Sequence, residues 1–136
     1  MRDLVYFLHL IGGIALILIP VLILLNIKTK PRWLSLLSGA GAAIGWLLLL
    51  PAGDLYTTYY PATKTLILAG NWPWAHGIIM ETKEHWGLLL GVVFSVAALL
   101  VLDKKYDESK KWWKLALILA IALGVLGRVI KMGAGA

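Results

Sequence analysis

Four long apolar runs constrain this chain more than any other feature of its sequence. The runs are Leu4–Ile27, Trp33–Gly53, Trp86–Leu102 and Leu115–Gly127, and none of them contains Asp, Glu, Lys or Arg. A transmembrane helix needs about 20 mostly apolar residues. We therefore predict one domain over residues 1–136, with spans of about 4–27, 33–53, 83–102 and 113–132.

The composition excludes several classes of protein. Hydrophobic residues make up 60% of the chain and charged residues 15%, against roughly 45–50% and about 25% in soluble domains. We therefore exclude a soluble enzyme, a disordered tail and a nucleic-acid-binding domain, despite the net charge of +6. The chain has no Cys, which excludes disulfides, thiolate zinc sites, iron–sulfur clusters and covalently attached c-type haem. The expected partner is the lipid bilayer.

The distribution of cations predicts the orientation. Residues 28–32 and 104–114 hold eight of the 13 Lys and Arg residues. The positive-inside rule makes the end that carries these two turns cytoplasmic. Both termini and the connection Asp54–Glu84 then lie outside, in a multi-pass protein of the cell membrane.

The short cytoplasmic turns predict antiparallel neighbours, and hence an all-α up-down-up-down bundle. Small residues at four-residue spacing, such as Gly41 with Gly45 and Gly87 with Gly91, predict closely packed helices. The segment Asp54–Glu84 is predicted to be a long outer loop that folds back over the bundle, partly as short helices. This loop is either an interfacial lid without a ligand or a lid over a site.

Histidines on two helices suggest a cofactor. All three, His9, His76 and His85, fall on the predicted outer side. At 1.5 Å per residue, His9 lies about 9 Å and His85 roughly 12 Å from the midplane. Imidazole is the usual axial ligand of non-covalent haem, and helix bundles build such sites from facing side chains. We therefore predict one haem b, its iron held by His9 and His85, with His76 as a reserve ligand or a lid residue.

Residues near these histidines fit the same interpretation. Gly12 and Gly13 share the face of His9 and leave room for a macrocycle or for another helix. Tyr6, three residues before His9, is placed to hydrogen-bond at the rim. Glu81, four residues before His85, is placed to accept a hydrogen bond from its ring and so fix the ligating tautomer.

Two cations in the fourth span complete the predicted site. A buried Arg in a membrane helix is costly and marks a functional site by default, so we expect Arg128 and Lys131 to bind the haem propionates. The alternative interpretation is that Arg128 extends to water and that His9 and His85 are packing residues. A di-iron site lacks the required Glu-x-x-His pair, and a zinc site built from His76, Glu81 and His85 has no recognised spacing.

Short motifs resemble a broad family of small four-helix membrane proteins of unknown function. They are Leu8-His9-Leu10, Gly53-Asp54, His85-Trp86-Gly87 and Leu126-Gly127-Arg128. The layout is also similar to that of b-type cytochrome membrane subunits. This resemblance implies electron transfer through haem bound by two histidines. The family often has a fourth-helix His where this chain has Gly127-Arg128, which implies one haem at most.

The sequence leaves two functional hypotheses from different classes. The first is a b-type cytochrome-like subunit that passes electrons between a membrane quinol and an outer-face redox protein. The second is a cofactor-free membrane subunit that anchors a larger complex. We expect other membrane subunits or a homo-oligomer, and an electron-transfer subunit rather than a free-standing enzyme. A weaker third hypothesis is an oligomeric carrier for a small solute.

Overall fold

A computed structural model describes residues 1–135, and helices form almost all of them. The six α-helices and two π-helical segments are α1 (Arg2–Asn26), α2 (Trp33–Leu47), α3 (Leu49–Asp54), η1 (Leu55–Tyr59), α4 (Tyr60–Ala69), η2 (Ala75–Met80), α5 (Glu81–Leu102) and α6 (Tyr106–Gly133). The described residues contain no strand. The all-α prediction is confirmed.

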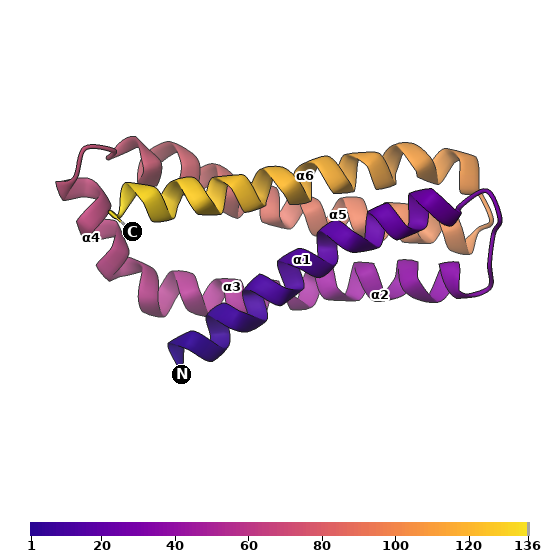
Figure 1. Ribbon diagram of the computed structural model, residues 1–136, viewed down its shortest axis with the longest axis horizontal. Coiled ribbons are helices and arrows are strands. Elements are labelled where there is room, and N and C mark those ends of the chain that lie inside the picture. Colours follow the sequence, from indigo (N-terminus) through magenta and orange to yellow (C-terminus); the bar gives the residue numbers. More distant parts are fainter. Residues whose placement is uncertain (136) are drawn as a thin grey trace.

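Four helical stretches are long and apolar enough to cross a membrane. They are Arg2–Asn26, Trp33–Ala69, Ala75–Leu102 and Tyr106–Gly133. The second joins α2, α3, η1 and α4 end to end, and the third joins η2 and α5. Both termini lie toward one end of the bundle and the two short turns lie at the other (Figure 1). We call the first the histidine end and the second, which holds residues 27–32 and 103–105, the basic end.

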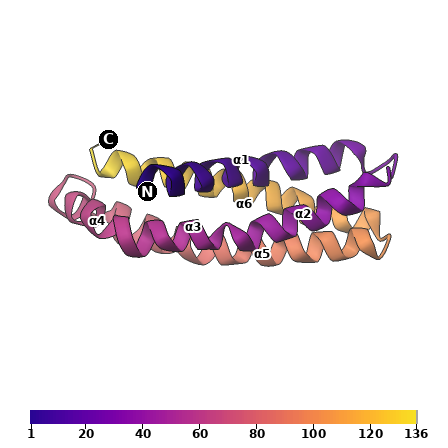
Figure 2. The ribbon, with the colours of Figure 1, turned by 90° about the horizontal axis from the view of Figure 1, so that it is seen from below.

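The connection between the second and third spans differs from the predicted long loop. Both spans continue as helix beyond the predicted boundaries, and only residues 70–74 separate α4 from η2. At 1.5 Å per residue, the 37 residues of Trp33–Ala69 can extend about 55 Å, against a hydrocarbon core of about 30 Å. This helical stretch is therefore longer than the hydrocarbon core requires, and α4 with the turn after it projects as one tip of the molecule (Figure 2).

The four long helices pack in a ring. The helix α5 contacts α2 and α6, and α1 contacts the same two helices, so α1 and α5 lie on a diagonal. Gly41, Gly45 and Gly91 permit close approaches between helices, as the small-residue spacing predicted, whereas a Cβ on Gly87 would meet nothing within 4 Å. A Cβ on Gly41 would lie 3.0 Å from side-chain atoms of both Ile19 and Phe94, and one on Gly45 would lie 3.6 Å from the Cα of Gly91.

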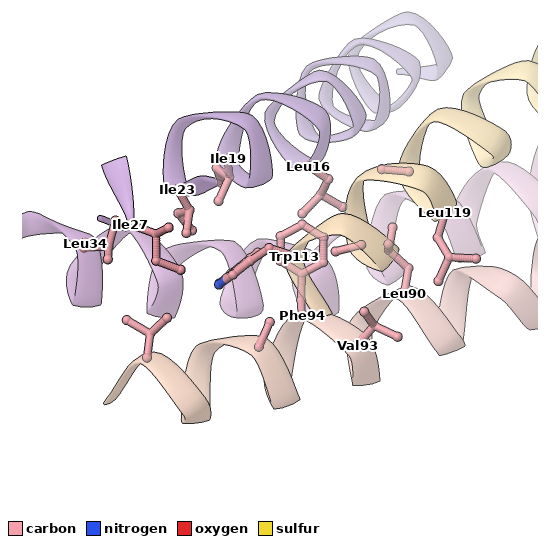
Figure 3. Packing of buried hydrophobic residues seen from close by; sticks show 14 residues of the cluster. Leu16, Ile19, Ile23, Ile27, Leu34, Leu90, Val93, Phe94, Trp113 and Leu119 are labelled. Carbon is pink, nitrogen blue, oxygen red and sulfur yellow. The ribbon is translucent and has the colours of Figure 1, made fainter. Parts of the chain in front are cut away.

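The main apolar core occupies the middle and the basic end. Phe94 and Trp113 lie at its centre, with Leu16 and Ile23 of α1 nearby and Leu34 of α2 toward its edge (Figure 3). A second, smaller cluster lies at the histidine end, where Tyr60, Ile67, Ala75 and Met80 pack with Ile130 of α6. The projecting hairpin is therefore anchored to the end of α6.

Candidate functional site

His9 belongs to the side of α1 that faces the other helices. It lies seven residues, almost two full turns, before the buried Leu16, so the two side chains share a face. The imidazole is half-buried. Its Nδ1 atom is buried and has no hydrogen-bond partner among residues 1–135. Leaving such a group without a hydrogen-bond partner costs about 1–3 kcal/mol, so this ring nitrogen is available to interact with a further group.

Lys83 and Glu84 place two further ionisable groups at this level. A Cβ on Gly127 of α6 would lie 3.4 Å from the Cε of Lys83. The aliphatic part of the lysine side chain therefore extends from α5 to the surface of α6. Its charge acts on His9. The Oε1 atom of Glu84 is buried and unpartnered among the described residues, while the Tyr56 hydroxyl lies beside that carboxylate.

Tyr60 connects these groups to His76. Its hydroxyl and the Nδ1 atom of His76 are joined by a hydrogen bond of 3.0 Å. The rings of Tyr56 and Tyr60 stack, with centroids 5.4 Å apart. We call His9, Tyr56, Tyr60, His76, Lys83 and Glu84 the histidine-end cluster.

Local backbone geometry positions most of this cluster. Tyr56 lies in η1, His76 lies in η2, and Lys83 and Glu84 follow in the first turn of α5. A π-helical turn rotates the residues after it relative to a continuous α-helix, and such turns occur frequently at functional sites. Tyr56, Tyr60, Lys83 and Glu84 were not among the predicted site residues. The adjacent charges of Lys83 and Glu84 at the edge of a span were the signal that could have indicated them.

His85 is not brought together with His9. It is exposed on α5, and α5 lies diagonally across the bundle from α1. Its Nδ1 donates a hydrogen bond of 2.7 Å to the backbone carbonyl of Glu81. The predicted partner of His85 is thus the right residue, but the acceptor is its carbonyl oxygen rather than its carboxylate. This bond leaves Nε2 of His85 as the free ring nitrogen.

The structure does bring Tyr6 and Lys131 together. The Lys131 ammonium lies 5.9 Å from the centroid of the Tyr6 ring, which places the end of α6 beside the start of α1. Arg128, one turn earlier on α6, is exposed rather than buried as predicted. Both cations are therefore available near the helix that carries His9.

The two glycines after His9 have different environments. A Cβ on Gly12 would lie 2.5 Å from the Cδ1 of Leu48, whereas one on Gly13 would meet nothing within 4 Å. Gly12 therefore makes room for a neighbouring helix, the second of the two roles predicted for it. The open space predicted for a macrocycle exists only beside Gly13.

These residues fit a haem in their chemistry and only partly in their placement. His9 has an unpartnered ring nitrogen, and His85 has the tautomer that a ligating imidazole adopts. The described side chains do not form an axial pair from His9 and His85. Residues 1–135 also contain no group of three or more His, Cys, Asp or Glu side chains that could hold a metal ion, but haem iron needs no more than two protein ligands.

Fold and site together define a small four-helix protein with the features of a multi-pass membrane protein and with ionisable groups at one end of its bundle. No known protein family, characterised protein or solved structure matches the chain. The resemblance to b-type cytochrome subunits therefore finds no support in these comparisons.

Proposed function

We propose that this protein is a membrane electron-transfer subunit that holds one haem b at its histidine end, with His9 as an axial ligand. The observation that carries the proposal is the buried, unpartnered Nδ1 of His9 on the core-facing side of α1. An unsatisfied buried group calls for an explanation, such as a bound ion or a redox role. Imidazole is also the commonest protein ligand of non-covalent haem iron.

Cations at the same end support this assignment. Lys131 lies beside Tyr6, one turn from His9, and Lys83 reaches α6 at Gly127. Together with Arg128 they place three positive charges around the level of His9. Two haem propionates would neutralise such charges at the membrane boundary.

A bound haem would supply one-electron transfer. His9 would hold the group on α1, while Arg128 and Lys131 would orient its carboxylates. A membrane quinol as electron donor and an outer-face redox protein as acceptor complete the proposal. Two successive one-electron transfers would oxidise one quinol, its two protons would leave to water, and each electron would pass to the acceptor protein.

The test is a visible absorption spectrum of the detergent-purified protein, recorded oxidised and after dithionite reduction. We expect a Soret band and a reduced α band in wild type and their loss in His9→Ala. His85→Ala and His76→Ala are matched variants, since each removes one imidazole. A band that disappears in only one of them identifies the second ligand. A featureless wild-type spectrum from haem-supplied cells would refute the haem assignment.

A cofactor-free anchor subunit is the second candidate. The exposed side of α5 favours it, because His85 and Trp86 present polar and aromatic groups away from the bundle. This candidate predicts a colourless protein that is monodisperse only together with a partner subunit. Size-exclusion chromatography of the purified chain, alone and after co-purification from its host, distinguishes the two candidates.

A further inference from the structure

A shallow groove of about 630 Å³ runs along the outward face of α2 at the basic end. Its walls are small or apolar residues, and its mouth holds one cation. The lining residues are Arg32, Ser35, Leu36, Gly39, Ala40, Ala43 and Leu102. This face differs from the one that carries Gly41 and Gly45, which are buried inside the bundle.

The groove spans about one leaflet of a bilayer. From Arg32 to Ala43 the helix rises about 17 Å, close to half of the roughly 30 Å hydrocarbon core. It is open at Gly39, where a Cβ would meet nothing within 4 Å. A single extended acyl chain has this shape, whereas a packed transmembrane helix would need contact over the full span.

The charge at the mouth favours an anion. Arg32 is exposed and forms no ion pair with the described residues. It occupies the N-cap of α2, where no side chain caps the first turn, so the positive end of the helix dipole lies beside it. Lys28 lies in the same turn, and Asp103, next to Leu102, is followed by two lysines.

We propose that this groove binds one anionic phospholipid from the leaflet at the basic end. Its acyl chain would lie along Gly39 and Ala43, and its phosphate would contact Arg32 and the first turn of α2. Basic pockets between membrane helices bind anionic head groups in this way. The proposal does not depend on the haem assignment, because the groove and His9 lie at opposite ends of the bundle.

Native mass spectrometry of the intact protein, delipidated in detergent, tests this inference. Phosphatidylglycerol and phosphatidylcholine with identical acyl chains are added at matched concentrations. We expect a single preferred phosphatidylglycerol adduct in wild type. Arg32→Gln should weaken it about fivefold, the effect typical of one basic residue near a membrane surface, and Gly39→Leu should abolish it by filling the groove.

Two control variants make the same kinds of change, loss of one positive charge and gain of one bulky side chain, outside the groove. Lys64→Gln removes an exposed cation from α4 at the opposite end of the bundle, and Gly124→Leu adds a bulky side chain at open space on α6. Both should retain the adduct. Equal binding of the two lipids, or an adduct that survives Gly39→Leu, would overturn the proposal. So would a wild-type dimer that Gly39→Leu dissociates, since the groove would then be a helix-docking face.

Discussion

The ring of Phe94 meets Trp113 edge-on, with centroids 5.5 Å apart and ring planes at 88°. Both side chains are fully buried (Figure 3). This contact joins α5 to α6, and Gly41 of α2 allows a third helix to approach the same phenyl ring. The helices α2, α5 and α6 therefore meet at one aromatic pair, and Leu16 and Ile23 of α1 pack in the same core.

Replacing Phe94 with Ala should destabilise the bundle by about 3 kcal/mol, because a large buried ring leaves a cavity that its neighbours cannot fill. Thermal unfolding in detergent, followed by circular dichroism, measures the effect. Leu99→Ala is the matched control on the same helix, since Leu99 is 61% exposed and should change the melting temperature little. Equal effects of the two variants would contradict the central role of the pair.

Gly41→Ala and Gly39→Ala should have opposite effects although they lie two residues apart. The new methyl group at position 41 would press on Ile19 and Phe94 at 3.0 Å, and such overpacking costs about 1–3 kcal/mol. The methyl group at position 39 meets open space, so the variant should gain up to about 1 kcal/mol from helix propensity. Unfolding curves of the two variants, recorded under identical conditions, measure both changes in the free energy of unfolding. A change of the same sign in both variants would contradict the prediction.

Tyr60→Phe should loosen the histidine end without affecting the main core. The change removes the hydroxyl that bonds His76 and leaves a partly buried ring nitrogen unpaired, at a cost of about 1–2 kcal/mol. Hydrogen–deuterium exchange should become faster over η2 and α4 and stay unchanged in the middle of α5. Tyr59→Phe is the control, because no hydrogen bond of the Tyr59 hydroxyl occurs among the described residues. The same exchange pattern in both variants would show that the Tyr60–His76 hydrogen bond does not stabilise the histidine end.

The orientation in the membrane can be tested with single cysteines, because the chain has none of its own. Asn71→Cys lies in the connection between α4 and η2, and Thr29→Cys lies in the turn between α1 and α2. The positive-inside rule predicts that a membrane-impermeant maleimide labels Cys at position 71 on intact cells and leaves position 29 unlabelled until the cells are lysed. The reverse pattern would invert the topology and place the histidine end in the cytoplasm.

The sequence predicted the four spans but not the helical structure between the second and the third. The four spans followed from hydropathy alone, because a bilayer requires about 20 apolar residues whatever the neighbours are. The helical nature of residues 54–69 and 75–82 was not predicted as a continuation of the spans, since Tyr, Pro and Trp in that region are equally compatible with an interfacial loop. Packing of Tyr60 and Ile67 against Ile130 of α6 selects helix there.

At the candidate site, the sequence predicted the depth of the histidines along their helices but not the direction of their side chains. The depth of His9 and His85 along their helices could be counted from sequence, because helical rise is constant. The direction of each side chain could not, since it depends on which helices are neighbours and on the π-helical turns of η1 and η2, which shift the facing residues. Tertiary structure alone therefore turned His85 outward, brought Lys131 beside Tyr6 and placed Lys83 and Glu84 at the level of His9. Apolar length and charge distribution are local properties of a chain, whereas facing side chains are a property of how its helices pack.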